Sequence, residues 1–344
     1  YSMTTLKQQV SLADYNTLRI DACAAWFCRI DSKAALISLL RTPAVTEKGG
    51  ILVIGGGSNL VLTRDFPGLV LLNAIKGIDV VHQDSDSVMV SVGGGENWDA
   101  FVAYSLSQGW AGLENLSAIP GTVGAAPIQN IGAYGVELKD CLVSVSTVEL
   151  VSGQVRQFDR QECEFGYRDS IFKKAEKDKH IITSVTFRLD KSPTLKLNYG
   201  EIRSEMDASR ISEKELTPVQ LRQLISTIRA RKLPDPKVTP NVGSFFKNPV
   251  IGKKQLQTIL ESFPDLVYFP ATDNDDVKLA AGWMIDRLGW KGKVLGMARV
   301  HSRQALVLTV REGHCEDLLT LAKSIQKDVS AHFGVVLEIE PRIV

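Results

Sequence analysis

The sequence predicts an α+β protein, with a strand-rich first half and longer helices in the second half. Apolar runs rich in β-branched residues occur at residues 50–54, 68–73, 87–92 and 142–150, and such runs are typical of strands. One helix is expected among them, at residues 97–108. Because helices are few here, the regular strand–helix alternation of a Rossmann sheet is not predicted. The G-x-G-x-x-G signature of that sheet, between a strand and a helix, is also absent.

A helix is expected to open at Thr217 and Pro218, which are suited to its cap and first position. Its buried stripe consists of apolar residues at helical spacing, namely Leu221, Leu224, Ile225 and Ile228. Pro234 and Pro236 end it, because proline cannot continue the helical hydrogen-bond ladder.

Two more helices are expected towards the carboxyl end of the sequence. Residues 277–288 and 318–333 carry apolar side chains at helical spacing, and Gly289 and Gly334 follow them as C-terminal stops. Residues 191–216 are charged and weakly periodic, so they are expected to form a connector.

Residues 335–344 are expected to form a closing strand. Side chains alternate between the two faces of a strand, so Glu338, Glu340 and Arg342 would share one face. This polar face is either the solvated face of an edge strand or a carboxyl group held over a ligand.

Composition limits the class of protein. The chain has 344 residues, 44% hydrophobic and 23% charged, with a net charge of +1, which is ordinary for a globular protein of two or three domains. The small net charge argues against nucleic acid or an anionic membrane as a partner. Apolar runs stay well below the ~20 residues that span a bilayer. Five scattered cysteines and five histidines show no metal-ligand spacing, so no metal site is predicted and a reducing cytoplasm is expected.

Three glycine-rich segments occur early in the chain. They are GGGSNL at residues 55–60, GGGENW at residues 93–98, and residues 112–135, which contain five glycines and two prolines. Glycine permits left-handed backbone and lets a ligand approach main-chain N–H groups. Such loops predict a cradle for a pyrophosphate, and therefore a dinucleotide or nucleotide-sugar site.

Several polar residues outside these loops are candidates for chemistry. Ser244 lies between Gly243 and two phenylalanines; a lone serine is usually a turn former, and without G-x-S-x-G a hydrolase elbow is not supported. Arg168 in FGYRDS is either a surface ion pair or a ligand contact. Arg229 belongs to a basic cluster at the end of a predicted helix, where cations oppose the helix dipole.

The chain also contains, in order, YNTLRID, GGGSNLVL, GENWDAFV, FGYRDSIFK, LNYG, RKLPDP, GSFFKNP, VKLAAGW, HSRQALVL and LEIEPRIV. This series resembles the UDP-N-acetylenolpyruvoylglucosamine reductases, flavoenzymes of peptidoglycan synthesis. The resemblance extends from residues 15–21 to residues 337–344. LNYG and the long connector at residues 191–217 are similar to the longer of the family's two types.

The resemblance implies a two-subdomain FAD-binding fold of the vanillyl-alcohol-oxidase (PCMH) type plus a C-terminal α+β substrate domain. Residues 1–75 and 76–230 would be the FAD-binding subdomains, the second completed by residues 335–344. Residues 231–334 would bind substrate.

It also implies non-covalent FAD, NADPH as cosubstrate, a UDP-sugar substrate and a cytoplasmic monomer. The expected FAD contacts are Gly55, Gly56, Gly57, Ser58, Asn59, Leu60, Ile119, Pro120, Gly121, Val123, Gly124, Gln129, Asn130, Gly132 and Arg229.

The implied reaction adds a hydride to an enolpyruvyl double bond, so negative charge develops beside a carboxylate. Groups aimed at that charge stabilise the transition state. Arg168 and Glu340 are expected to do so, and Ser244 is expected to donate the proton. Glu340 could donate a hydrogen bond only if protonated, so its pKa should be raised. The expected substrate contacts are Tyr199, Lys232, Asn248 and Gln304.

Two positions depart from the family pattern. A tyrosine that the family often has at the position of Phe269 is here Tyr268, and LEIEP replaces L-E-P-E, which makes Glu338 an alternative to Glu340. Two other functions remain open: an oxidase of the same flavin superfamily, although GGGSN lacks a histidine for covalent flavin, and a non-catalytic UDP-sugar sensor.

Overall fold

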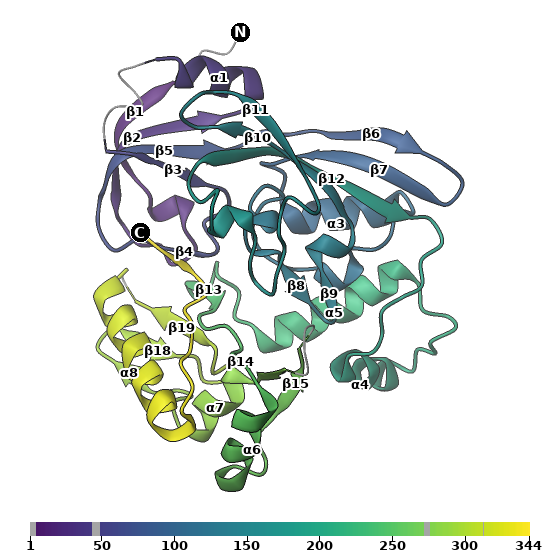
Figure 1. Ribbon diagram of the computed structural model, residues 1–344, viewed down its shortest axis with the longest axis vertical. Helices are drawn as coiled ribbons and strands as arrows, with labels where there is room; N and C mark the ends of the chain where they lie inside the picture. The colour runs from purple at the N-terminus through teal and green to yellow at the C-terminus, as the bar shows by residue number, and fades with distance from the viewer. Residues whose placement is uncertain (1–4, 43–48, 272–275, 312) are drawn as a thin grey trace. The chain divides into compact units, whose positions relative to one another are not determined.

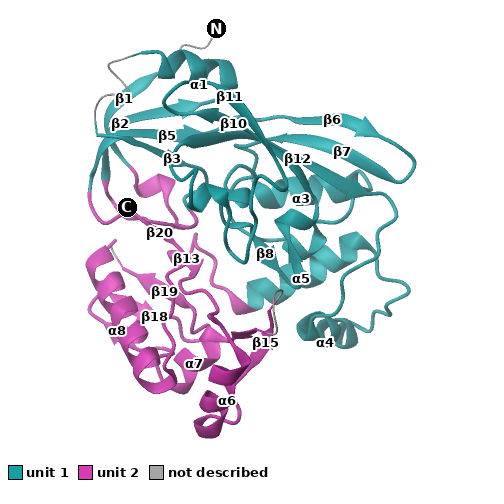
Figure 2. Ribbon diagram, in the orientation of Figure 1, with its two compact units in different colours: residues 1–11, 23–57, 65–231 teal, residues 12–22, 58–64, 232–344 magenta. Residues whose placement is uncertain are grey.

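The computed structural model describes residues 5–42, 49–271, 276–311 and 313–344 (Figure 1). The chain forms two compact units (Figure 2). The first contains Tyr1–Ser11, Cys23–Gly57 and Asp65–Arg231, and the second contains Leu12–Ala22, Ser58–Arg64 and Lys232–Val344. The C-terminal segment, expected to complete an FAD-binding subdomain, is grouped with the second unit. The three expected domain ranges stay a prediction.

The first unit contains a four-stranded sheet with the order β1-β2-β5-β3. Its strands are β1 (Leu6–Ser11), β2 (Cys23–Ile30), β5 (Phe66–Asn73) and β3 (Ile51–Ile54). β2 and β3 each pair with β5 in parallel, whereas β1 and β2 are antiparallel. The strands predicted at residues 50–54 and 68–73 are confirmed as β3 and β5.

A five-stranded antiparallel sheet, with the order β11-β10-β12-β7-β6, belongs to the same unit. Its strands are β11 (Val155–Asp159), β10 (Leu142–Glu149), β12 (His180–Asp190), β7 (Ser87–Gly93) and β6 (Ile78–Gln83). β10 and β7 confirm the strands predicted at residues 142–150 and 87–92. The hairpin of β8 (Gly132–Ala133) and β9 (Val136–Glu137) begins in the third glycine segment and ends just after it.

The helices of the first unit are α1 (Lys33–Leu40), α3 (Trp98–Ser107), α4 (Gly200–Ser209) and α5 (Pro218–Lys232). Short 3-10 turns occupy Glu114–Leu116, Ala126–Gln129, Leu138–Asp140 and Ile171–Lys173. α3 confirms the helix expected at residues 97–108. It is capped by Asn97, whose side chain accepts from the N–H of Ala100, and it packs apolar residues against the five-stranded sheet (Figure 1).

The expected connector at residues 191–216 is wrong in part, because it contains α4. Ile202 and Met206 lie one helical turn apart and are buried, and they join the confirmed stripe of α5 in one apolar cluster. Only these two side chains of α4 are buried, so its apolar periodicity is too sparse to stand out among the charges.

The second unit contains three smaller sheets, with the orders β13-β19-β18-β17, β14-β16-β15 and β20-β4. The first comprises β13 (Asn241–Ser244), β19 (Val307–Val310), β18 (Ala298–Val300) and β17 (Val294–Leu295). The second comprises β14 (Val250–Ile251), β16 (Val277–Leu279) and β15 (Tyr268–Pro270). The third pairs β20 (Arg342–Ile343) with β4 (Leu60–Val61) in parallel.

Its helices are α6 (Lys253–Ser262), α7 (Ala281–Arg287) and α8 (Cys315–Phe333), with a 3-10 turn at Ala13–Tyr15. The helix expected at residues 277–288 is wrong at its start. Residues 277–279 form β16 instead, because they pair on both sides with β14 and β15. Gly289 and Gly334 follow α7 and α8 with φ of 70° and 64°, as the predicted C-terminal stops require.

The closing strand expected at residues 335–344 is wrong for most of its length, because the chain changes partner near Pro341. Before it, Ile339 bridges to Phe246; after it, Arg342 pairs with Leu60. Proline has no N–H to continue one ladder through this point. The expected alternation holds at the start, where Val335 and Leu337 are buried, and fails at Ile343, which is 40% exposed.

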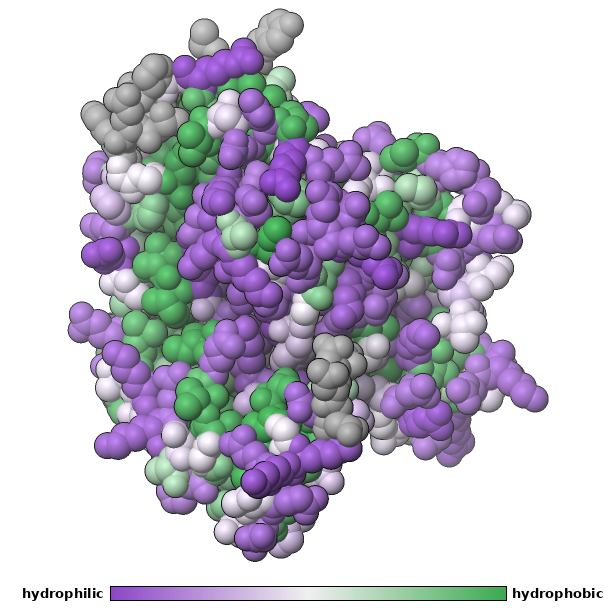
Figure 3. Space-filling model, in the orientation of Figure 1, coloured by the Kyte–Doolittle hydropathy of each residue, from purple (hydrophilic) through white to green (hydrophobic). Residues whose placement is uncertain are grey.

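On the face drawn in Figure 3, hydrophilic side chains cover most of the surface and hydrophobic residues form separate groups. None of the described helices has the length and hydropathy needed to cross a membrane. Across the same parts of the chain, no three His, Cys, Asp or Glu side chains are grouped to hold a metal ion.

Candidate active site

Two of the three glycine segments meet main chain to main chain in the first unit. A Cβ on Gly56 would lie 3.0 Å from Cα of Gly121, and a Cβ on Gly55 would lie 2.3 Å from Oγ1 of Thr122. A side chain at Gly55 or Gly56 would therefore collide with the facing segment, and neither of these two glycines is fully buried. Oγ1 of Thr122 is buried and has no hydrogen-bond partner within the described chain. The site fits FAD, because a pyrophosphate can approach glycine main chain closely and can accept a hydrogen bond from such a hydroxyl.

The other glycine segment, GGGENW, packs inside the protein instead. Gly94 accepts from the N–H of Gly124 at 2.8 Å, and a Cβ on Gly94 would lie 2.2 Å from the carbonyl oxygen of Ile182. Residues 93–95 are buried. The glycines of GGGENW thus allow close packing of the main chain. The interpretation that all three glycine segments form the cradle is therefore not supported for GGGENW.

Arg168 lies at the tip of a tight turn in which Gly166 and Asp169 bridge each other. Its φ is 53°, a conformation that non-glycine residues rarely adopt. The guanidinium donates to the carbonyl oxygen of Gly132 at 2.7 Å. Arg168 is therefore brought to the third glycine segment.

Asn130, a predicted FAD contact, is fully buried and has a φ of 46°. Its side-chain amide donates to Glu137 and to the carbonyl oxygen of Gly166, and its Oδ1 accepts from the N–H of Lys139. These bonds join the glycine segment to the turn that carries Arg168.

Arg229 is also brought to the third glycine segment. Its Nε donates to the carbonyl oxygen of Ala118 at 3.3 Å, and its side chain hydrogen-bonds Tyr134. Burial lowers the pKa of Arg229. Tyr134 in turn contacts Tyr199 edge to face, with ring centroids 5.3 Å apart, and burial raises the pKa of Tyr199.

Thr122 and Tyr134 were missed as candidates. The signal available was their position inside the third glycine segment, where a hydroxyl or phenol among small residues is unusual. The structure adds what the sequence lacks, namely the buried hydroxyl of Thr122 and the contact of Tyr134 with Arg229.

Ser244 and Glu340 come together in the second unit. β13 carries a bulge, since Asn241 pairs with Thr309 and Ser244 with Val307, and the extra residue is accommodated by Gly243 with a φ of 73°. Glu340 donates its main-chain N–H to the carbonyl oxygen of Phe245 at 2.9 Å. The hydroxyl-bearing and carboxyl-bearing residues are thus held by adjacent backbone segments.

Glu338, the alternative carboxylate, has a different environment. Its side chain is 68% exposed and pairs with Nζ of Lys247 at 2.5 Å. The carboxylate of Glu338 therefore faces solvent, whereas the side chain of Lys247 is only 10% exposed.

The side chains of Asn248 and Gln304 both lie close to the first residues of α7. Oδ1 of Asn248 accepts from the N–H of Ala281 at 3.0 Å, and a Cβ on Gly282 would lie 3.7 Å from Oε1 of Gln304. Lys232 is the last residue of α5 and is partly buried. Of the other predicted FAD contacts, Asn59 accepts from the N–H of Arg342, and Leu60 is buried in β4.

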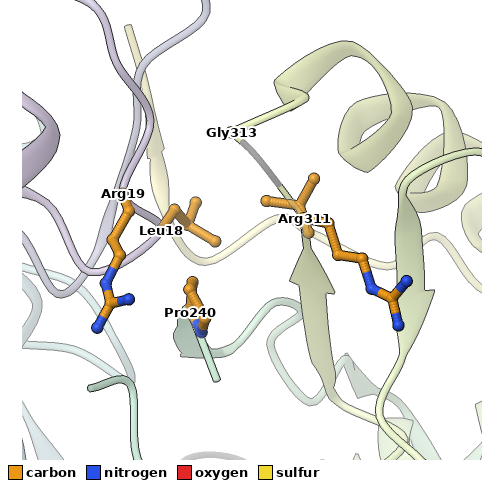
Figure 4. Close-up of a pocket in the computed structure, with 6 residues that line it drawn as sticks. Leu18, Arg19, Pro240, Arg311 and Gly313 are labelled. Carbon is orange, nitrogen blue, oxygen red and sulfur yellow. The ribbon is translucent and has the colours of Figure 1, made fainter. Parts of the chain in front are cut away.

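A separate cavity of about 370 Å³ occurs in the second unit (Figure 4). Its lining residues are Leu18, Arg19, Pro240, Val310, Arg311 and Gly313. These residues are distinct from the predicted site residues. The guanidinium of Arg19 donates a hydrogen bond to the carbonyl oxygen of Lys237.

Comparisons with known proteins bear on both units. The family model described as "UDP-N-acetylenolpyruvoylglucosamine reductase, C-terminal domain" matches residues 235–344, and an "FAD binding domain" model matches residues 24–159. Proteins named UDP-N-acetylenolpyruvoylglucosamine reductase from Burkholderia cenocepacia (strain HI2424) and Burkholderia vietnamiensis (strain G4 / LMG 22486) are 52% and 51% identical over 331 residues, covering 96% of this chain and 94% of theirs.

The crystal structure of UDP-N-acetylenolpyruvylglucosamine reductase from Thermus caldophilus is 23% identical and matches with a TM-score of 0.69 over 99% of both chains. This likeness confirms the predicted α+β fold class. The FAD-binding match confirms FAD as cofactor, and the Burkholderia relatives confirm an oxidoreductase as the type of protein. The chain belongs to the UDP-N-acetylenolpyruvoylglucosamine reductase family.

Proposed function

We propose that this protein reduces the enolpyruvyl group of UDP-N-acetylglucosamine enolpyruvate to give UDP-N-acetylmuramate, with NADPH as electron donor, in peptidoglycan synthesis. The family of the chain supports the reaction. The observation that carries the mechanism is the pairing of Glu340 with the residue that follows Ser244. The cradle would hold FAD, which would supply the hydride for the terminal carbon of the enolpyruvyl double bond, with NADPH as the source of the electrons.

Ser244 is the proposed proton donor. Its Oγ–H gives a proton to the carbon beside the substrate carboxylate, so that the double bond gains one hydride and one proton. A hydroxyl is a weak acid and suits only a strongly basic acceptor such as an enolate. The bulge at Gly243 supports this role, because bulges redirect side chains next to active sites.

Arg168 and Glu340 are proposed to stabilise the enolate. The guanidinium of Arg168 places positive charge beside the substrate carboxylate, where negative charge develops. Glu340, when protonated, donates a hydrogen bond to that carboxylate. The left-handed backbone of Arg168 supports this role, because strained residues concentrate at functional sites.

Four residues are proposed to bind the substrate. Lys232 and Tyr199 are proposed to hold the diphosphate, since a compact ammonium group suits phosphate and a tyrosine can cover it. Asn248 and Gln304 are proposed to assist with the diphosphate and the sugar.

FAD binding is assigned to the cradle of residues 55–57 and 119–124, with Arg229 beside it. Ser58, Asn59, Leu60, Gln129 and Gly132 are proposed to extend it. Asn130 acts by shaping the loop through its three hydrogen bonds, and we add Thr122 as a direct contact.

The experiment that tests this function measures NADPH oxidation by purified, FAD-loaded protein with and without the enolpyruvyl UDP-sugar. Sustained NADPH oxidation only with the sugar, and formation of UDP-N-acetylmuramate, supports the proposal. Turnover with oxygen alone would indicate an oxidase instead. Flavin that is reduced by NADPH without any reduction of the UDP-sugar would indicate a UDP-sugar sensor. The cytoplasmic location and the monomeric state stay predictions.

A further inference from the structure

The residue just before the segment Ile119–Pro120–Gly121 has an unusual backbone. Ala118 has a φ of 57°, the left-handed region in which an alanine costs on the order of 1 kcal/mol or more. This conformation sets the direction in which the following residues enter the FAD cradle. Something in the surroundings must hold it.

Both main-chain polar groups of Ala118 form hydrogen bonds with side chains. Its N–H donates to Oδ1 of Asp99 at 2.6 Å, and its carbonyl oxygen accepts from Nε of Arg229 at 3.3 Å. Asp99 lies in the first turn of α3, where a carboxylate is also favoured by the helix dipole.

Asp99 is itself fixed by a second arginine. Arg222 on α5 donates from its two terminal nitrogens to the two carboxylate oxygens of Asp99, at 2.5 and 3.0 Å. Such a bidentate pair restricts both position and orientation. Burial raises the pKa of Asp99, but the hydrogen bonds from Arg222 and Ala118 outweigh it and leave the pKa below its ordinary value. The carboxylate is therefore ionised when it accepts from Ala118.

Other residues of GENWDAFV contact the same loop through their main-chain atoms. The N–H of Trp98 donates to the carbonyl oxygen of Gly121 at 3.1 Å, and Glu96 accepts from the N–H of Val123 at 2.9 Å. Asn97 bridges to Thr122. Because these contacts use main-chain atoms, a substitution at Asp99 removes the side-chain contribution without removing them.

We propose that Asp99, oriented by Arg222, is a positioning residue that holds Ala118 and the following loop in the conformation that binds FAD. The inference rests on FAD binding by residues 119–124. A pair that merely joined α3 to α5 would need only the arginine contacts, whereas Asp99 also accepts from the strained residue of the loop. The ion pair of Arg231 with Glu205 at 2.7 Å, between α5 and α4, offers a matched control.

The test compares FAD release from purified holoprotein of the parent, Asp99→Ala, Asp99→Asn and Glu205→Gln. Flavin fluorescence on dilution reports the dissociation constant, and the visible circular dichroism of the flavin reports its environment. We expect Asp99→Ala to weaken FAD binding by roughly tenfold or more, as for loss of a charge-assisted hydrogen bond. Asp99→Asn, which keeps one acceptor, should have an intermediate effect with an altered flavin spectrum. Glu205→Gln should leave both readouts at the parental value.

An FAD affinity and flavin spectrum of Asp99→Ala equal to those of Glu205→Gln would overturn the proposal. Should Asp99→Ala fail to fold, Arg222→Gln keeps the acceptor for Ala118 but frees its orientation, and it should then also release FAD faster. An unchanged release rate in Arg222→Gln would overturn the role of Arg222. Because the readout is FAD binding, a parent protein that holds FAD but reduces no UDP-sugar would refute the proposed reaction and leave this inference standing.

Discussion

The main-chain N–H of Glu340 donates to the carbonyl oxygen of Phe245 over 2.9 Å. The pairing continues at Ile339 with Phe246, and at Lys247, whose N–H donates to the carbonyl oxygen of Glu338. The order of these contacts places Glu340, rather than Glu338, nearest to Ser244 along the paired backbones. The first two predictions depend on this order.

Ser244→Ala should separate the two halves of the reaction. NADPH should still reduce the flavin at the parental rate, because that step needs no proton from Ser244. Reoxidation of the reduced flavin by the enolpyruvyl UDP-sugar should slow on the order of a hundredfold or more. Stopped-flow absorbance measures the two steps separately. Slow flavin reduction by NADPH would show that Ser244 has another role.

The two C-terminal glutamates should differ in their effect on turnover. Glu340→Ala should lower kcat on the order of a hundredfold, and Glu340→Gln should retain more activity, since an amide can replace a protonated carboxyl as donor. Glu338→Ala should keep kcat within a few-fold of the parent. The side chain of Glu338 is 68% exposed and pairs with the largely buried Lys247, so its loss should lower stability rather than turnover. Steady-state kinetics of the three variants decides between the residues; a greater loss in Glu338→Ala would reverse the assignment.

Arg168→Ala should damage turnover more than binding. The guanidinium is expected to act on charge that develops during the reaction, so kcat should fall on the order of a hundredfold while KM for the UDP-sugar changes little. Arg160→Ala, which alters an exposed arginine eight residues earlier, is the control and should behave like the parent. An equal loss in kcat and in UDP-sugar affinity would make Arg168 a simple anchor.

Gly55→Ala should impair FAD binding because the added Cβ would meet Oγ1 of Thr122 at 2.3 Å. Overpacking of this kind costs about 1–3 kcal/mol, equivalent to roughly a tenfold or larger loss of FAD affinity. Thr122→Ala should also weaken binding, by removing the hydroxyl that lacks a partner.

The double variant Gly55→Ala/Thr122→Ala should bind FAD no more weakly than Thr122→Ala, because the remaining Cβ of residue 122 is at 3.4 Å, near ordinary contact. Gly200→Ala, where an added Cβ meets nothing within 4 Å, is the control. Additive losses in the double variant would argue against a steric origin.

The ionisation of Glu114 should lower the stability of the folded protein as pH rises above the ordinary carboxyl pKa. This carboxyl is buried and accepts from the N–H of Gly112 at 2.7 Å, and burial raises its pKa. A raised carboxyl pKa favours folding while the group is protonated, so this contribution is lost as pH rises from the ordinary carboxyl value through the raised one. Glu114→Gln should therefore gain stability relative to the parent over that rise.

Urea unfolding over a pH series measures this difference. Glu176→Gln should show the opposite dependence. The hydrogen bond from His180 lowers the pKa of Glu176, so the stability that Glu176 contributes is present above the ordinary carboxyl value and is lost as pH falls through the lowered one. The same slope in both variants would refute the assignment to Glu114.

Local sequence patterns predicted the strands and helices whose apolar residues suffice to define them. β5 and α5 are such elements, since a β-branched run and a helical stripe need no knowledge of their partners. β16 was mistaken for helix because Val277 also fits a helical stripe with Ala281 and Met284, and its partner Ile251 in β14 lies well before it in the sequence. α4 was missed for the reverse reason, a scarcity of buried residues.

Residue types that carry chemistry were recognisable in the sequence, but their supporting contacts were not. Ser244 and Glu340 stand out by type and motif, whereas their juxtaposition depends on pairing between distant segments. Nothing in the local sequence distinguishes Asp99 from the other charged residues. Its relation to Ala118 depends on a backbone angle and a long-range hydrogen bond, which no local pattern encodes.

The pairing of β20 with β4 has a consequence for biosynthesis. Oγ1 of Thr63 donates to the carbonyl oxygen of Val344, 281 residues further along the chain. During translation, residues 58–64 must therefore wait, without this partner, until residues 342–344 have left the ribosome. Closing so long a loop is entropically costly and slow, so the second unit should acquire its protease resistance last, after the first unit has matured around its nucleotide loops.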